Sequence, residues 1–192
     1  MLKTDNFDKV EITSIEDLRN WLIDNHNQDK GVWLVTFKKC EITKYVSREE
    51  VLDELLCFGW IDGIRRKLDE KRTMQLITRR RVQHWSKTYK ERVSKLIEQG
   101  KMHDSGLRSI SISKSNGLWN FMDDVDDLIV PDDLQKELSK KKEALEFFNS
   151  INPSSKRFVL RWVKLAKTEK TRKNRIQKLV ELSSKGEKLP GS

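Results

Sequence analysis

Residues 55–86 read LLCFGWIDGIRRKLDEKRTMQLITRRRVQHWS, and this stretch decides the fold that we expect. Its opening run at residues 58–61 is aromatic and apolar, and side chains of this kind favour burial. Two basic triplets follow, Arg65-Arg66-Lys67 and Arg79-Arg80-Arg81, and these require water or an anionic partner. Residues that favour burial therefore lie next to basic residues, and we expect a functional site in this stretch.

The same stretch predicts a β-hairpin. Residues 60–68 and 73–79 have strand length and are rich in β-branched and aromatic side chains, and the four residues 69–72 between them are polar. A turn at these four residues pairs the two strands in antiparallel fashion. We expect the second basic triplet to form a cluster beside Trp85, with the first triplet on the facing strand of this hairpin.

Upstream of the hairpin, the pattern predicts two helices and a strand. Ser14 and Ser47 each precede a carboxylate three residues later, the capping-box arrangement at the start of a helix, and apolar residues follow at helical spacing. We expect helices over residues 14–25 and from Ser47 to a stop near Gly59. The run VWLVTF at residues 32–37 predicts a strand in the middle of a small sheet.

Downstream, the pattern is helical almost throughout, with a start at Ser86 and another at Asn152-Pro153. The acidic residues 123–127 indicate a loop, which lacks the glycine and the terminal glutamate of a calcium-binding EF-hand. We therefore expect an α+β fold, with a small antiparallel sheet and helices in the N-terminal half and a helical C-terminal half packed against it. The two regions are residues 1–85 and 86–192, expected to form one compact unit.

The charge of the chain is high and uneven. The net charge is +9, and 36% of the 192 residues are charged. Residues 61–101 carry 13 Lys and Arg against 5 Asp and Glu, and residues 152–192 carry 12 against 3. If these two basic blocks share a face they form a cationic surface, and if they face the acidic blocks they are neutralised within the fold.

Targeting and redox features are sparse. No run approaches the roughly 20 apolar residues of a membrane span, and Met1-Leu2-Lys3-Thr4-Asp5 has no apolar segment of a signal peptide. We expect a cytoplasmic protein with no membrane span. In such a reducing compartment Cys40 and Cys57 are expected to be buried free thiols.

The order of several motifs resembles a known family. The motifs are CFGWIDG at residues 57–63, then Arg79-Arg80, Trp85-Ser86, Gly100-Lys101-Met102, Trp162, Ala166-Lys167, Thr171-Arg172 and Arg175-Ile176. This order is similar to that of the YdeI/OmpD-associated, or bacteriocin-protection, family over about residues 21–186, with residues 58–63 as the most specific part. Where that family usually has a Thr-Pro-Arg turn and an asparagine, this chain has Thr78-Arg79 and Tyr89. The resemblance implies a small bacterial protein linked to resistance against bacteriocins and cationic antimicrobial peptides, and it implies no particular biochemical activity.

The candidate binding residues form two sets. The first set is Trp60, Asp62, Arg79, Arg80 and Trp85, and the second is Lys167, Arg172 and Arg175. Guanidinium groups bind phosphate or carboxylate through two hydrogen bonds, and an indole stacks on a base or ring. Each set also has a purely structural interpretation, as a solvated face or as charges paired within the fold. The binding hypothesis requires the two basic segments to lie on a common side, beside an indole.

Asp62 is the candidate for catalysis. Its apolar neighbours Trp60 and Ile61 favour a raised pKa, whereas hydrogen bonds from backbone amides or an ion pair with Arg79 would make it structural. The three histidines and two cysteines are not at metal-ligand spacing, and no phosphate loop or dinucleotide fingerprint is present. We therefore expect no metal and no cofactor.

Three functional hypotheses remain open. The leading one is a non-enzymatic bacterial tolerance protein of the YdeI/OmpD-associated type, which binds an anionic ligand or a protein partner through a basic, tryptophan-bearing surface. The second is a nucleic-acid-binding module on the same surface, which a steep dependence of affinity on salt would indicate. The third is an enzyme acting on a small anionic substrate around Asp62. The oligomeric state is left open.

Overall fold

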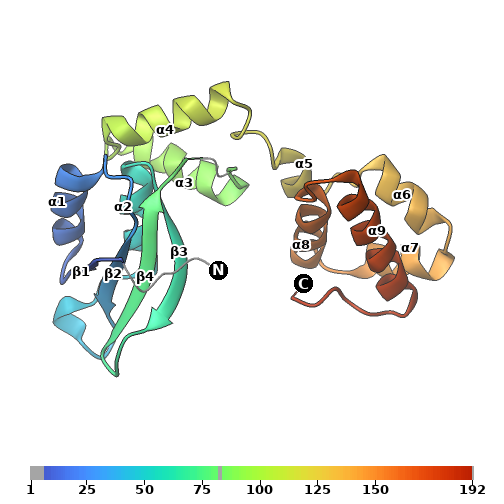
Figure 1. The fold of residues 1–192 in the computed structure, drawn as a ribbon, viewed down its shortest axis with the longest axis horizontal. Helices are drawn as coiled ribbons and strands as arrows, with labels where there is room; N and C mark the ends of the chain where they lie inside the picture. Colours follow the sequence, from blue (N-terminus) through green and yellow to red (C-terminus); the bar gives the residue numbers. More distant parts are fainter. Residues whose placement is uncertain (1–6, 82–83, 192) are drawn as a thin grey trace. The chain divides into compact units, whose positions relative to one another are not determined.

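The structure is a computed structural model that describes residues 7–81 and 84–191. The N-terminal residues 1–5, on which the expected lack of a signal peptide rested, lie outside the described part. The chain divides into two compact units, Met1–Asn120 and Phe121–Ser192, and Figure 1 shows a sheet with helices in the first and helices in the second. Each unit has its own hydrophobic core. The fold is α+β, as expected.

The sheet of the first unit has four strands within the described residues, in the order β1-β2-β4-β3. Its strands are β1 Lys9–Glu11, β2 Val32–Phe37, β3 Trp60–Lys67 and β4 Arg72–Arg79. β2 is internal and buried along its whole length, as the VWLVTF run predicted. The expectation of a purely antiparallel sheet is wrong, because β1 pairs with β2 in parallel. With three residues, β1 is too short for a recognisable strand pattern.

β3 and β4 form the predicted antiparallel hairpin, but its register separates the two basic triplets. Trp60 lies opposite Arg79 at one end of the hairpin, and Lys67 lies opposite Thr73 at the other end. The first triplet therefore lies beside the turn, whereas the second lies at and beyond the opposite end. The first triplet is on the strand that faces the one ending at Arg79, as expected. The two triplets do not form one cluster, however, because an antiparallel register places residues close to the turn on both strands together.

The helices α1 (Ile15–Asn25) and α2 (Arg48–Cys57) begin where the sequence predicted. The hydroxyls of Ser14 and Ser47 accept a hydrogen bond from the N–H of the third helical residue, and each box is completed by the carboxylate of that residue. The 3₁₀ helix η2 (Ile42–Lys44) lies between β2 and α2. After α2, Gly59 has φ +73°, a backbone conformation that favours glycine and ends the helix near the predicted position.

Two further helices belong to the first unit: α3 (Lys87–Glu98) and α4 (Asp104–Ser115). Their residues Val93, Leu96 and Ile110 join the core that the sheet and α2 form. The boundary between the units consequently follows Asn120, whereas the change of sequence pattern suggested a boundary after Trp85. A change from strand to helix spacing marks a new element, but it does not show which core that element joins.

The two thiols differ in their surroundings. Both are free, and Cys40 is exposed whereas Cys57 belongs to the core of the first unit. Burial raises the pKa of the Cys57 thiol to about 12. The expectation of two buried thiols is therefore confirmed for Cys57 and is wrong for Cys40.

The second unit is helical. Its helices are α5 Asp123–Asp126, α6 Asp132–Ser139, α7 Lys142–Ser150, α8 Pro153–Lys164 and α9 Glu169–Ser184. The expected acidic loop forms the single helical turn α5, because Val125 within it is buried in the core. The side chain of Asn152 caps α8 and Pro153 occupies its first turn, as predicted. None of the helices in the described segments has the length and apolar character to cross a membrane.

Candidate functional site

The two tryptophans of the first candidate set lie in the core. Trp60 is 0% exposed and Trp85 is 1% exposed. The indole N–H of Trp60 donates a hydrogen bond of 3.1 Å to the carbonyl of His26, and the rings of Trp60 and Trp21 pack edge to face with their centroids 5.5 Å apart. Neither indole is therefore available in this structure as an exposed stacking surface, which differs from the expected binding surface.

Arg80 lies next to Trp85 and is only 6% exposed. The carbon at the centre of its guanidinium is 3.9 Å from the centroid of the Trp85 ring and 5.6 Å from that of Tyr89. Burial lowers the pKa of this guanidinium to about 10, so it remains charged at neutral pH. The charge of Arg80 is therefore held inside the first unit, against aromatic faces that attract cations.

Asp62 is half-buried and hydrogen-bonded by side chains. Its Oδ2 accepts a bond of 3.0 Å from Gln75, and its Oδ1 accepts one of 3.1 Å from the hydroxyl of Tyr89. These partners differ from the backbone amides and Arg79 that the sequence suggested. Asp62 and Gln75 line a small hollow of about 140 Å³, together with residues that include Arg92. Both carboxylate oxygens already have donors, which favours a structural role.

Arg79 is exposed and makes only long contacts within the described residues. Its Nη1 donates to the carbonyl of Asn27 at 3.4 Å and lies 3.8 Å from the carboxylate of Asp29. That carboxylate is much closer to Arg81, at 2.5 Å. The donors of Arg79 are therefore weakly occupied.

Arg79 borders the largest hollow near the first candidate set, of about 340 Å³, which we call the arginine–serine hollow. Its lining residues are Asn27, Phe58, Gly59, Arg79, Arg80, Ser105, Arg108, Ser109 and Ile112. They come from the turn after α1, the end of α2, the end of β4 and one face of α4. None of these described lining residues is acidic, so the local charge is positive.

Arg108 is the residue of the hollow that the sequence interpretation missed. It is exposed on α4 and has no ion pair or side-chain hydrogen bond among the described residues. Ser105, Arg108, Ser109 and Ile112 are spaced i, i+3, i+4 and i+7, which places them on one helical face. This spacing was visible in the sequence, but the position of this face at the same hollow as Arg79 depends on how α4 packs.

Two glycines allow α4 to lie close to the end of α2. A Cβ on Gly106 would stand 2.1 Å from the carbonyl oxygen of Cys57, and one on Gly59 would stand 2.9 Å from the Cβ of Ser109. The hydroxyl of Ser105 donates a 3.0 Å hydrogen bond to the carbonyl of Phe58 across the same contact. Of these two glycines, Gly59 also lines the arginine–serine hollow.

A pair of histidines adjoins this contact. The His103 ring stacks on Phe58 with centroids 4.7 Å apart, and it lies 4.7 Å from the His26 ring. The Nδ1 of His103 accepts a hydrogen bond from the N–H of Ser105 and so caps α4. Burial, followed by the charge of His26, lowers the pKa of His103, which favours the neutral ring that this cap needs.

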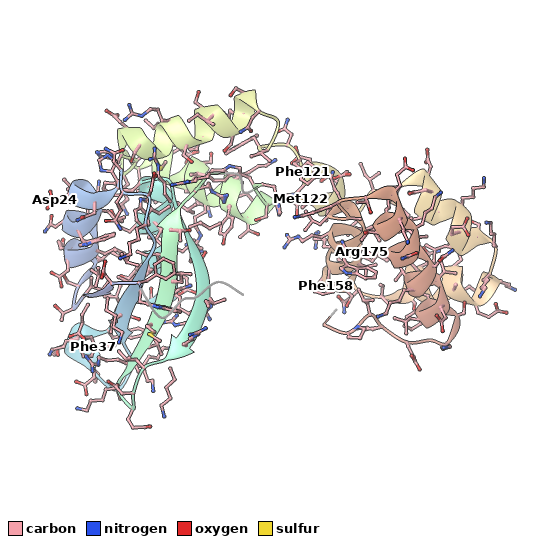
Figure 2. All side chains as sticks on the ribbon, in the orientation of Figure 1. Asp24, Phe37, Phe121, Met122, Phe158 and Arg175 are labelled. Atoms are coloured by element: carbon pink, nitrogen blue, oxygen red, sulfur yellow. The ribbon has the colours of Figure 1, made fainter. Side chains whose placement is uncertain are left out.

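The second candidate set belongs to the second unit. Arg172 donates two hydrogen bonds to Asp133, of 2.6 and 2.8 Å. Arg175 donates to the carbonyl of Trp162 and lies 5.1 Å from the centroid of its ring, and Figure 2 shows Arg175 on α9. Lys167 is exposed between α8 and α9. Pairing within the fold therefore accounts for both arginines.

The structure therefore brings Asp62, Arg80 and Trp85 into one buried cluster and places Arg79 at the arginine–serine hollow. Lys167, Arg172 and Arg175 lie in the other unit. In the described part of the chain, no group of three or more His, Cys, Asp or Glu side chains is arranged to hold a metal ion.

Two family models match separate segments of the chain. Residues 10–109, slightly more than half of the chain, match a family described as a domain of unknown function (DUF8412). Residues 127–186 match the family described as bacteriocin-protection, YdeI or OmpD-associated. No curated protein and no solved structure matches the chain.

The suspected family is thus supported by the second unit, whereas residues 58–63, its expected most specific part, fall in the segment that the other model matches. By the extent of these matches, the chain belongs to the DUF8412 family, and its second unit carries the match to the bacteriocin-protection family.

Proposed function

We propose that this protein is a cytoplasmic, non-enzymatic binding protein of the bacteriocin-protection type, and that it binds an anionic ligand in the arginine–serine hollow. The family match of residues 127–186 supports the protective role at the level of the family. The observation that carries the binding proposal is Arg108, an exposed guanidinium that lines a hollow whose described lining residues include no carboxylate.

The charge of the protein favours an anionic ligand over direct capture of a cationic peptide. The chain has a net charge of +9, so a cationic peptide is repelled at long range. An anion is attracted, and guanidinium groups bind carboxylate or phosphate with directed pairs of hydrogen bonds. Protection is therefore proposed to act through an anionic molecule of the cell and not through the toxin itself.

The arginine–serine hollow also has an apolar side chain, in place of the exposed tryptophan that the sequence predicted. Trp60 and Trp85 are buried, but the exposed Ile112 lines the hollow beside the basic and hydroxyl groups. A ligand with a charged group and a small apolar or polar body is compatible with both kinds of wall.

Titration of the full-length protein with small anions, followed by calorimetry, tests the proposal. Arg108→Ala is expected to weaken binding about tenfold or more, because a hydrogen-bonded charge pair is lost. The control is Arg161→Ala, which removes another exposed arginine, on α8, and leaves the hollow intact. Equal affinity of the wild type and Arg108→Ala for every anion that binds would refute the assignment of the site.

The second candidate function is nucleic-acid binding, favoured by the net charge and by exposed Arg79 and Arg108. It predicts an affinity for oligonucleotides that falls steeply between about 50 and 200 mM salt, because bound counterions are released from the phosphates. A flat dependence on salt would argue against it.

A further inference from the structure

The basic and hydroxyl groups of the arginine–serine hollow come from different walls. Arg79 is the last residue of β4, whereas Arg108, Ser105 and Ser109 lie on one face of α4. The hydroxyl of Ser105 already donates to the carbonyl of Phe58, but its oxygen and the Ser109 hydroxyl still border the space. The hydrogen-bond donors of the hollow would therefore reach a bound ligand from more than one side.

Donors on more than one wall match a group with several acceptor oxygens. A carboxylate has two oxygens, and a single guanidinium fork occupies both. The phosphate of a monoester has three terminal oxygens and a charge of about −1.5 to −2 at neutral pH. Two guanidinium groups and a hydroxyl are therefore better matched to a terminal phosphate than to a carboxylate.

A phosphodiester fits this set less well. It carries a single charge and leaves two free oxygens, and its chain continues in both directions from the phosphate. The hollow is bounded by the end of α2 and by α4, which approach each other closely at Gly59 and Gly106. A terminal group enters such a space with one connection to the rest of the ligand.

The volume of the hollow and its apolar lining indicate the size and character of the organic group that carries the phosphate. A volume of about 340 Å³ lies in the range of small-molecule sites, which is roughly 300–1,000 Å³. Ile112, which is 56% exposed, provides apolar surface next to the charged groups. The space thus accommodates a phosphate together with a small organic body.

Arg79 is able to bind a phosphate because the acceptors that it contacts within the first unit are distant. The carboxylate of Asp29 lies 3.8 Å from Arg79 and 2.5 Å from Arg81, so Arg81 takes the larger share of its charge. The remaining contact of Arg79 is the long hydrogen bond to Asn27. A phosphate would replace weak contacts with charge-assisted ones.

Resting on the proposed anion-binding function, we infer that the arginine–serine hollow recognises the terminal phosphate of a small phosphomonoester. Arg79 and Arg108 bind the phosphate oxygens from two elements of the fold, Ser109 adds a hydroxyl donor, and Ile112 contacts the organic body.

Calorimetry on the full-length protein at constant ionic strength tests this inference with matched probes. Glycerol 3-phosphate is compared with glycerate, and an oligonucleotide with a 5′-phosphate is compared with the same oligonucleotide with a 5′-hydroxyl. Inorganic phosphate is a third probe, which lacks the organic body. We expect glycerol 3-phosphate to bind at least tenfold more tightly than glycerate, and the 5′-phosphate to strengthen oligonucleotide binding.

Substitutions test whether the phosphate binds at the arginine–serine hollow. Arg108→Ala is expected to weaken binding of glycerol 3-phosphate at least tenfold, and Arg108→Lys should recover only part of this loss because an ammonium lacks the planar fork. Ser109→Ala should cause a smaller loss, and Arg161→Ala should cause none. Circular dichroism confirms that each variant is folded.

The outcomes separate this inference from the function on which it rests. If glycerate binds as tightly as glycerol 3-phosphate and Arg108→Ala weakens both, the hollow is an anion site but the phosphomonoester assignment is overturned. If the oligonucleotide binds equally with and without its 5′-phosphate and more tightly than the small phosphates, the nucleic-acid function replaces it. If none of the probes binds, both proposals fail.

Discussion

The first unit carries 23 Lys and Arg and the second carries 16, and the pairing of particular cations differs between them. In the second unit, Arg172 is held by Asp133, and Lys164 lies 2.5 Å from the carboxylate of Asp124. In the first unit, Arg108 has no such partner in the described segments, and Arg79 has only distant ones. The pairing of each charge, and not the number of charges, distinguishes a site from a solvated face.

The largest expected effect concerns the contact that shapes the first unit. Gly106→Ala places a Cβ 2.1 Å from the oxygen and 2.8 Å from the carbon of the Cys57 carbonyl, and both of these carbonyl atoms belong to the backbone. We expect a loss of about 3 kcal/mol in the free energy of unfolding, at the upper end of overpacking effects. Urea denaturation followed by tryptophan fluorescence measures it, because the tryptophans at 21, 33, 60, 85 and 119 all belong to the first unit.

Gly117→Ala provides the control for this substitution. Gly117 has φ +79°, but no atom lies within 4 Å of the position of its Cβ. We expect it to cost about 1 kcal/mol through backbone strain alone. Losses of equal size at the two glycines would show that α4 does not approach α2 as closely as the structure places it.

The next effect tests a buried charge of the first unit. Glu54 is buried and accepts a 2.7 Å hydrogen bond from Arg19. Arg19→Ala leaves this carboxylate without its ion-pair partner, and we expect a loss of about 2 kcal/mol at pH 7. Burial already raises the pKa of Glu54, and the substitution raises it further.

The pH dependence of this loss has a definite sign. A carboxyl with a raised pKa in the folded state binds a proton more readily when folded, so the penalty is full above that pKa and fades as the pH falls towards the unfolded value. Urea denaturation at several pH values between 4 and 7 measures it, and a penalty that grows on acidification would contradict the explanation. Arg161→Ala again serves as the exposed control.

The smallest effect concerns the charge pair of the second unit. Asp133 is already partly exposed to water, so its carboxylate stays hydrated when Arg172→Ala removes its partner. We therefore expect the free energy of unfolding to fall by no more than about 1 kcal/mol. Hydrogen bonds from Arg172 lower the pKa of Asp133, and the contribution of the pair is lost as the pH falls through that lowered value. Titration of Asp133 by NMR should show its pKa rising towards the ordinary range in the variant. An unchanged pKa would mean that the two side chains are not paired in solution.

Local sequence signals predicted most elements of the fold. Ser14, Ser47 and Asn152 were recognisable caps, and the VWLVTF run was a recognisable buried strand, because these signals depend on residues close together in the chain. The parallel pairing of β1 and the membership of α4 in the first unit depend on contacts between distant residues. Those contacts leave little trace in composition or spacing.

The candidate site was predictable only in part. Arg79 was identified from its charge, but Arg108 was missed because its environment depends on the packing of α4 against α2. Trp85 was expected on the surface because it follows a basic run, yet its indole is covered and Arg80 packs on it. A basic residue next to an aromatic one in sequence gives the same pattern whether the pair faces water or the core.

The burial of Cys57 has a practical consequence. Its carbonyl accepts a hydrogen bond from the N–H of His103 at 3.1 Å, so this residue lies at the contact between α2 and α4. Because only a thiolate reacts readily with an alkylating reagent, Cys40 should be modified at once and Cys57 only during transient exposure. The rate of modification at Cys57 then reports how often these helices separate, with Cys40 as an internal standard in the same molecule.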